Sequence, residues 1–185
     1  YMQCLGSHSD HAGYVVTGVT KPRTALHGVF SRNSRTRIAD ITDGTSNTAM
    51  FAEIKKGPNY TGSLLAVPAG DPTDFQVATR DTVVWTGNDQ LTPPAACENR
   101  ATTAWMYRGL QYYRGLLVAT YYNHTLTPNA KRRDCITSAL WQGHMAARSF
   151  HSGGAQIVLA DGSVRFASES VDSGVWSAIG SIGNG

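Results

Sequence analysis

The sequence predicts an α+β domain in which an antiparallel β-sheet with long loops precedes a short C-terminal helix. Three observations support this fold class. Apolar residues alternate along several short segments, as they do in half-buried strands. The 19 glycines mark many turns. Asp172 stands just before an apolar stripe that Gly180 ends, which indicates one short helix. The length of 185 residues fits a single globular domain over residues 1–185.

Alternation and turn residues place the strands of the sheet. The expected strands are Thr48–Ile54, Leu116–Tyr122, Ala155–Ala160 and Ser163–Ala167. Glu53 is a carboxylate near the end of an otherwise apolar strand, so it must face solvent or have a partner. Arg165, on the polar side of the last strand, is the expected partner, and we interpret this pair as structural.

The last two strands are predicted to form a hairpin around Asp161-Gly162. Asp-Gly between two alternating runs is a strong signal for a two-residue type I′ turn, which needs φ > 0 at both positions. Such a turn pairs Leu159 with Val164 and Ile157 with Phe166. Cross-strand partners share a face, so these four side chains are expected to form one apolar patch.

The C-terminal helix is expected over Ser173–Ile179, with Asp172 as its N-cap and Gly180 at its end. Its apolar face is spaced to dock on the sheet. That face is formed by Val175, Trp176 and Ile179.

Composition excludes several classes of protein. Only 16% of residues are charged, well below the usual quarter, and the chain has eight tyrosines and four tryptophans. This balance is typical of a secreted β-rich protein. The net charge of +3 is small, and the cluster Lys131-Arg132-Arg133 is too short for a nucleic-acid footprint. No run approaches the roughly 20 apolar residues of a membrane-spanning helix.

The three cysteines lie outside any Cys-x-x-Cys pair, which argues against a zinc or redox motif. Cys97 and Cys135 both lie in polar, loop-like segments. A disulfide between them would close a loop of about 39 residues and stabilise the fold by roughly 3–4 kcal/mol. The alternative is a pair of buried free thiols. Cys4 is left without an assigned partner.

Two stretches carry a family resemblance. His151 is followed after nine residues by Asp161-Gly162, and an earlier stretch reads Ile-Thr-Asp-Gly-Thr-Ser-Asn-Thr over residues 41–48, ahead of a strand ending in Glu53. Together with Pro128-Asn129 and Asp134-Cys135, these stretches resemble a large prepilin-like bacterial family of type IV pilin and type II secretion pseudopilin character. The resemblance covers roughly residues 14–180.

The resemblance implies the globular head of a pilin-like subunit, located outside the cytoplasm, with like subunits or other envelope and secretion components as partners. Members of that family open with a prepilin leader and a long apolar helix. We therefore expect residues 1–185 to be the C-terminal part of a longer chain that meets the membrane only through that helix. The residues expected to form the structural motif are Asp43, Gly44, Asn47, Glu53, His151, Asp161, Gly162 and Arg165.

Asp43 is the candidate metal ligand. Asp43-Gly44 begins a tight loop, and carboxylate and carbonyl oxygens on such a loop suit Ca²⁺. The alternative is a loop closed by side-chain-to-backbone hydrogen bonds, without a metal. We expect no other cofactor.

The most aromatic segment, residues 105–123, is a candidate sugar-binding platform, because tyrosine faces stack on sugar rings. The alternative is ordinary packing of strand aromatics on the sheet. The candidate residues are Tyr107, Tyr112, Tyr113, Tyr121 and Tyr122, with Arg108 and Arg114.

His151 and Asp161 are the candidate catalytic residues. Extension of the hairpin pairing places His151 opposite Asp172, where the pair would be a base, a metal ligand or a structural clasp. We favour the clasp, and the absence of a nucleophile elbow or phosphate loop argues against an enzyme.

Three functions follow from these candidates. The first is the pilin-like structural head, and the second is an extracellular carbohydrate or small-solute binding module. The third is a secreted hydrolase that uses His151 with Asp161, Asp172 or Asp43.

Overall fold

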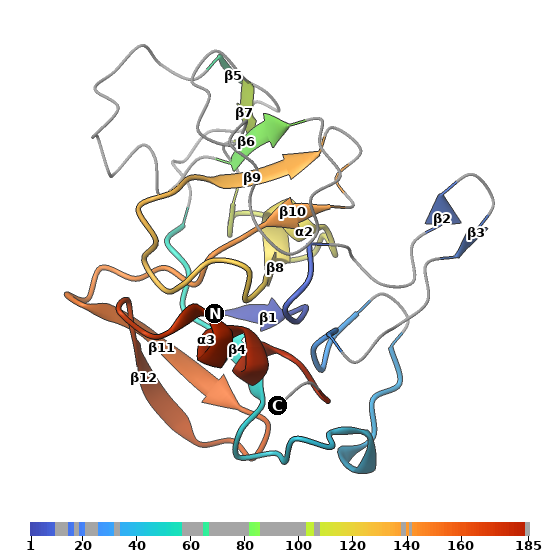
Figure 1. The fold of residues 1–185 in the computed structure, drawn as a ribbon. Helices are drawn as coiled ribbons and strands as arrows, with labels where there is room; N and C mark the ends of the chain where they lie inside the picture. The colour runs from blue at the N-terminus through green and yellow to red at the C-terminus, as the bar shows by residue number, and fades with distance from the viewer. Residues whose placement is uncertain are drawn as a thin grey trace.

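The computed structural model describes residues 1–9, 15–16, 19–20, 26–31, 34–56, 65–66, 82–85, 103–105, 108–137, 140 and 142–183. These residues form two five-stranded sheets, a two-stranded ribbon and short helices, so the predicted α+β class is confirmed (Figure 1). Among the helices in these ranges, none has both the length and the apolar character that crossing a membrane requires.

The first sheet, called here the hairpin sheet, has the strand order β12-β11-β4-β1-β8. Its strands are β1 (Met2–Cys4), β4 (Ala49–Ala52), β8 (Tyr121–Tyr122), β11 (Gly154–Leu159) and β12 (Val164–Ser168). The β11 strand pairs antiparallel with both β12 and β4, and β1 pairs antiparallel with β4. Because β8 runs parallel to β1, the sheet is mixed rather than wholly antiparallel.

The second sheet has the order β10-β9-β6-β7-β5, and its β6 and β9 strands are parallel. Its strands are β5 (Leu65–Ala66), β6 (Thr82–Trp85), β7 (Thr103–Trp105), β9 (Asp134–Thr137) and β10 (Gly143–His144). A separate ribbon pairs β2 (Val15–Val16) with β3 (Val19–Thr20), and η1 (Ile38–Asp40) is a single 3-10 turn.

The hairpin forms at the predicted place, but the predicted turn type is wrong. Leu159 O accepts from Gly162 N at 2.9 Å, and Leu159 N donates to Ser163 O at 2.9 Å, so the loop holds three residues. Gly162 has a φ of 86°, whereas Asp161 is not among the non-glycine residues with positive φ. These features define a type I turn followed by a glycine bulge, the common three-residue hairpin loop.

The extra loop residue shifts the register by one and reverses the face of every β12 side chain. Ile157 lies opposite Arg165, and Gln156 lies opposite Phe166. Ile157 is buried, but Val164 and Phe166 are 61% and 49% exposed. The predicted single apolar patch is therefore wrong: Val164 and Phe166 lie on the outer face, and Arg165 shares the inner face with Ile157.

The predicted strand Leu116–Tyr122 is wrong over most of its length. Leu117–Thr120 form a helical turn, α2, and only Tyr121–Tyr122 are strand. Thr120 Oγ1 donates to Leu116 O at 3.3 Å, which supports the turn. Residues 117–119 are fully buried in succession, and this burial outweighs the strand propensity of the segment.

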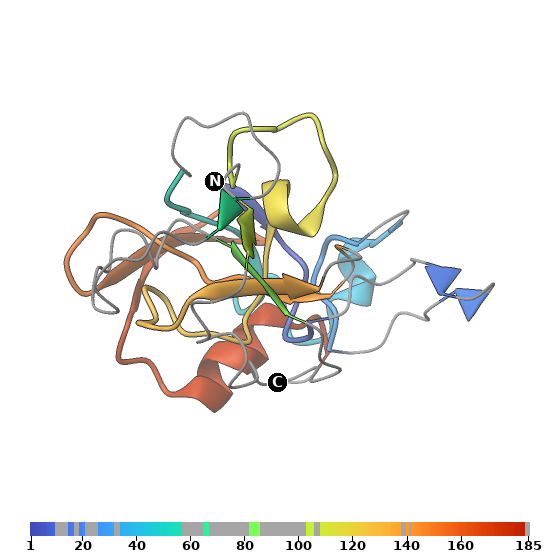
Figure 2. The same cartoon turned by 90° about the horizontal axis from the view of Figure 1, so that it is seen from above.

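The helix α3 (Ser173–Gly180) crosses β4 in Figure 1 and lies to one side of the hairpin sheet in Figure 2. Asp172 Oδ1 accepts two N–H groups of the first turn at 2.9 and 3.0 Å, so the predicted N-cap is confirmed. Trp176 is buried and stacks on His124 with ring centroids 3.8 Å apart. Val175 is 53% exposed, so only part of the predicted docking face is buried.

His124 connects α3 to the hairpin sheet. Its Nδ1 lies 2.6 Å from Trp176 O, which can only accept, so Nδ1 carries the proton and Nε2 accepts from Tyr122 Oη at 3.1 Å. Burial lowers the pKa of His124 to about 3. A Cβ atom on Gly180 would lie 2.4 Å from this ring, so the contact requires glycine.

A buried charge cluster lies where the two sheets meet. Asp134 Oδ2 is 3.1 Å from Arg108 Nε, and Asp134 Oδ1 is 2.9 Å from Arg148 Nη2. None of the three side chains is more than 1% exposed. Other guanidinium N–H groups of the cluster donate to the backbone carbonyl groups of Tyr121, Ala130, Arg132 and Ala146.

Candidate functional site

The two motif stretches lie side by side along β4 and β11. Thr45 O accepts from Asp161 N at 3.1 Å, and Thr48 O accepts from Ala160 N at 2.8 Å. At the other end of the pair, Glu53 N donates to Gln156 O at 3.0 Å. Segments more than 100 residues apart in the chain therefore form one continuous structure, with a pocket beside it.

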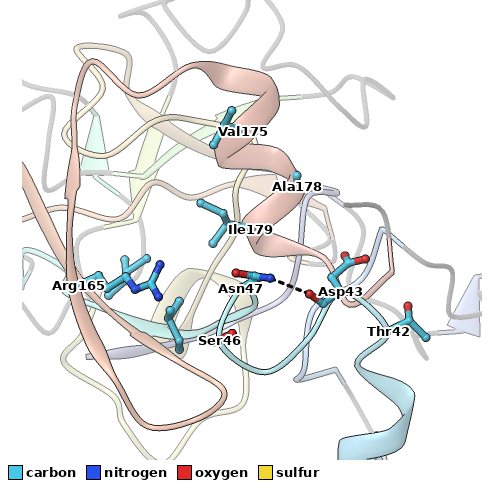
Figure 3. Close-up of a pocket in the computed structure, with 10 residues that line it drawn as sticks. Thr42, Asp43, Ser46, Asn47, Arg165, Val175, Ala178 and Ile179 are labelled. Atoms are coloured by element: carbon cyan, nitrogen blue, oxygen red, sulfur yellow. Dashed lines mark hydrogen bonds between the residues drawn. The ribbon is translucent and has the colours of Figure 1, made fainter.

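The pocket has a volume of about 460 Å³ and lies between the hairpin sheet, α3 and the loop before β4 (Figure 3). Its size is within the range of about 300–1,000 Å³ common for small-molecule sites. It is lined by Thr42, Asp43, Ser46, Asn47, Ile157, Leu159, Arg165, Val175, Ala178 and Ile179. Three of these residues, Asp43, Asn47 and Arg165, belong to the predicted motif.

The loop wall is held by its own hydrogen bonds. Gly44 has a φ of 90°, which favours glycine, and Asn47 Nδ2 donates to Asp43 O at 3.0 Å. Thr48 Oγ1 donates to Gly44 O at 3.1 Å. Thr42 Oγ1 donates to Ile182 O at 3.0 Å, which fixes the loop to the segment after α3.

The sheet wall follows from the observed register. Ile157 and Leu159 alternate on β11 and face α3, and Arg165 is opposite Ile157 on β12. In Figure 3 the guanidinium of Arg165 points toward Asn47 and Ile179 across the pocket. Within the described part of the chain, no hydrogen bond or ion pair to this guanidinium is found.

Asp161 serves the turn itself. Its Oδ1 accepts from Ser163 N at 2.9 Å and from Ser163 Oγ at 2.7 Å. These bonds lower the pKa of the Asp161 carboxyl group, and the charge of Arg165 lowers it further by a smaller amount. The side chain thus has the hydrogen bonds of a turn residue.

The predicted ion pairs at the other end of the motif are wrong. His151 Nε2 is 3.5 Å from Glu53 Oε1, and Glu53 Oε2 accepts from Gln156 N at 2.8 Å. Glu53 therefore faces His151 rather than Arg165. Asp172 is not the partner of His151, because its carboxylate caps α3. Both predictions extrapolated the two-residue turn, and the three-residue turn changes the facing residues.

The loop that carries His151 is held by a residue that the sequence did not single out for this role. Asn129 Nδ2 donates to Gly154 O at 2.9 Å and to His151 O at 3.4 Å, and Asn129 Oδ1 accepts from Ser149 N at 2.8 Å. Asn129 adopts a φ of 52° and is 7% exposed. Its place in the Pro128-Asn129 motif was the available signal.

The candidate tyrosines do not form one platform. Tyr122 is fully buried beneath His124, while Tyr112 and Tyr113 are exposed with their rings edge to face, 5.7 Å apart. Tyr107 lies outside the described residues. Tyr112 and Tyr121 line a second pocket of about 410 Å³ together with Tyr1. Arg108, placed with these tyrosines in the prediction, belongs to the buried cluster instead.

Metal binding by Asp43 stays a prediction. In the described ranges, no group of three or more His, Cys, Asp or Glu side chains is arranged to hold a metal ion. Asp43 Oδ2 accepts from Ser181 Oγ at 3.5 Å.

The cysteine prediction involves Cys97, which lies outside the described residues, so the Cys97–Cys135 bridge also stays a prediction. Cys135 is buried on β9. Cys4 is a free buried thiol, and burial raises its pKa to about 12.

Fold and motif together define a class of protein: an α+β domain whose C-terminal hairpin joins a sheet begun near residue 1 and is followed by a capped helix. The model of a family described as "Protein of unknown function (DUF1559)" matches residues 7–174. This match covers most of the chain, which therefore belongs to that family, one associated with prepilin- and pseudopilin-like proteins. Neither a curated protein nor a solved structure matches the chain.

Proposed function

We propose that this chain is the structural head of a pilin- or pseudopilin-like envelope protein and acts by packing against a second copy of itself or a related subunit. Membership in the DUF1559 family supports this proposal. The observation that carries it is the outer face of β12. Val164 and Phe166 are 61% and 49% exposed there, on a strand at the end of the sheet order.

An edge strand with exposed apolar side chains is an unusual feature in a monomer. Such strands offer unpaired backbone groups to another chain, and monomeric proteins normally protect them with charges, prolines or covering segments. On the outer face of β12, Val164 is opposite Val158, and Phe166 is opposite Gln156. This face, which we call the β12 outer face, therefore suits a contact between subunits.

The test is the oligomeric state of the protein across a concentration series. We expect the wild-type chain to self-associate, and the double variant Val164→Ser, Phe166→Ser to shift the midpoint at least tenfold toward higher concentration. Ile38→Ser is the matched control, because Ile38 is 78% exposed on η1, outside the β12 outer face. The proposal would be overturned if sedimentation finds the wild-type chain monomeric at every concentration while its circular dichroism spectrum shows that it is folded.

The proposal has two further parts: the protein is located outside the cytoplasm, and Cys97 and Cys135 form a disulfide there. The low content of charged residues supports this location, and disulfides persist in such compartments. Because Cys4 is buried as a free thiol, the other two cysteines are the remaining candidates for a pair. Non-reducing peptide mapping of the exported protein tests the bridge, and two alkylated thiols at these positions would refute it.

A second candidate function is carbohydrate binding at the pocket lined by Tyr1, Tyr112 and Tyr121. The specific observation is that Tyr112 is 88% exposed beside this pocket, where its ring is accessible for stacking on a sugar. A glycan array with wild-type protein and Tyr112→Ala tests it. Signals that are lost in the variant support binding there, and signals that persist place it elsewhere.

A further inference from the structure

The pocket beside α3 combines an apolar floor with one accessible cation. Five of its lining residues are aliphatic and come from two elements: Ile157 and Leu159 from β11, and Val175, Ala178 and Ile179 from α3. Val175 remains 53% exposed although it faces this pocket. A ligand with an apolar body would cover that surface and gain the usual free energy of burial.

Arg165 supplies the polar end of the pocket. A guanidinium group beside apolar surface favours a carboxylate, because two parallel charge-assisted hydrogen bonds replace lost hydration. The nearby carboxylates of the hairpin sheet and α3 are engaged by other groups: Glu53 by His151 and Gln156, Asp161 by Ser163, and Asp172 by the first turn of α3. In the described chain, no carboxylate forms an ion pair with Arg165.

The remaining polar lining restricts the charge of the ligand. Ser46 and Asn47 lie beside Arg165 in Figure 3, where the Ser46 hydroxyl group can donate to a head group, while Asn47 Nδ2 already donates to Asp43 O. Asp43 lines the pocket beyond Asn47 and places a negative charge there. A second negative charge on the ligand would be repelled by this carboxylate.

We propose that this pocket binds a small amphipathic monoanion, a medium-chain carboxylate whose carboxylate pairs with Arg165 and whose aliphatic body lies on Ile157, Leu159 and α3. This site is separate from the β12 outer face, because the two surfaces lie on opposite sides of the hairpin. The inference therefore does not depend on the proposed assembly function.

Isothermal titration of the 185-residue protein with octanoate and dodecanoate tests the proposal. We expect both to bind, dodecanoate more tightly, while octanol and octylammonium bind at least tenfold more weakly than octanoate. Arg165→Gln should weaken octanoate binding at least tenfold, and Arg165→Lys should retain part of it. The matched control is Arg35→Gln, which removes an exposed arginine outside the pocket and should leave the affinity unchanged.

Two further variants locate the site. Ala178→Phe fills the pocket from the solvent-accessible side of α3 and should abolish binding while circular dichroism stays unchanged. The Val164→Ser, Phe166→Ser variant should bind octanoate normally, because it alters only the β12 outer face.

Three results would overturn the proposal: equal binding of octanoate and octanol, unchanged affinity in Arg165→Gln, or loss of binding in the β12 variant. No binding of either carboxylate to folded wild-type protein at millimolar concentration would overturn it as well.

Discussion

The molecule contains two arginine sites that contrast in almost every respect. Arg108 and Arg148 are fully buried around Asp134, and their N–H groups donate to backbone carbonyl groups of several segments. Arg165 lies on a strand at the sheet edge, exposed, above an apolar pocket, without an ion pair in the described residues. The buried arginines pair with groups of the protein itself, and Arg165 remains available to a ligand.

This difference indicates that the buried arginines stabilise the fold, whereas Arg165 is available to bind a ligand. A buried Arg–Asp–Arg cluster is costly to desolvate, and removal of one partner leaves a buried charge unpaired. The cluster joins β9 of the second sheet to Tyr121 of the hairpin sheet, so it holds the sheets at their junction. Removal of Arg165 leaves no buried group unpaired, so the fold should tolerate it. Variants of Asp134 and Arg165 test this contrast directly, and variants of His124, Asn129 and His151 show where other polar groups lie between these two extremes.

The largest effect is expected at the buried cluster. Asp134→Asn removes the charge that both buried arginines face, and should lower the free energy of unfolding by about 3–5 kcal/mol. Urea denaturation followed by tryptophan fluorescence measures the change. Asp161→Asn is the control, because Asp161 is exposed in a turn, and it should cost far less. A loss below about 1 kcal/mol for Asp134→Asn would show that the cluster does not hold the sheets together.

The second-largest effect is expected from acid, which should destabilise the fold through the buried side chain of His124. The pKa of His124 is about 3 in the folded protein and near 6.5 when unfolded, so the unfolded chain binds the extra proton between these values. Stability from this group is therefore fully present above pH 6.5 and is lost as pH falls toward 3, by up to a few kcal/mol.

Urea midpoints between pH 7 and pH 4 check this acid sensitivity. His124→Gln should be less stable at pH 7 but should show a pH slope smaller by about one proton. An unchanged slope in that variant would assign the acid sensitivity to other groups.

Intermediate effects are expected at the loop of His151. Asn129→Ala leaves His151 O and Ser149 N without a side-chain partner and removes one of the two side-chain donors to Gly154 O, so it should cost about 1–3 kcal/mol. His151→Ala removes only a partly exposed contact with the Glu53 carboxylate and should cost less than about 1 kcal/mol. Thermal melts of both variants test the ranking. The reverse order would restore the His151 side chain as the clasp.

The smallest effect is expected at the pocket. Arg165→Gln should change the free energy of unfolding by no more than about 0.5 kcal/mol, because it breaks no internal contact of the described chain. Urea denaturation of this variant beside Asp134→Asn compares the two sites directly. A loss of several kcal/mol would mean that Arg165 belongs to the architecture, like Arg108 and Arg148.

The sequence predicted those elements of the fold that depend on residues close together in the chain. Alternation and the Asp-Gly dipeptide located the hairpin, and Asp172 located the start of α3, because both signals act within a few residues. The turn length was not predictable from Asp161-Gly162 alone, since both the two- and three-residue loops accept this dipeptide. That single residue moved Arg165 to the pocket side and invalidated its predicted pairing with Glu53.

Other parts of the structure had no local signal. Arg108, Asp134 and Arg148 meet only after the sheets assemble, so spacing along the chain does not indicate the cluster. The short helix α2 replaced a predicted strand because burial of residues 117–119 outweighed propensity. The sequence indicated the loop wall of the pocket through Asp43, Gly44 and Asn47. It also indicated the apolar face of α3, but as a surface packed on the sheet and not as the wall of a pocket.

The contacts of α3 and the residues after it also govern when the protein can fold. Cys4 Sγ donates a hydrogen bond to Gly180 O, 176 residues further along the chain, and Thr42 Oγ1 donates to Ile182 O, 140 residues further along. Contacts of such sequence separation make folding slow, and the core around residue 4 cannot close until residues 176–182 have been synthesised. A nascent chain therefore cannot complete this part of the core before residues 176–182 have left the ribosome.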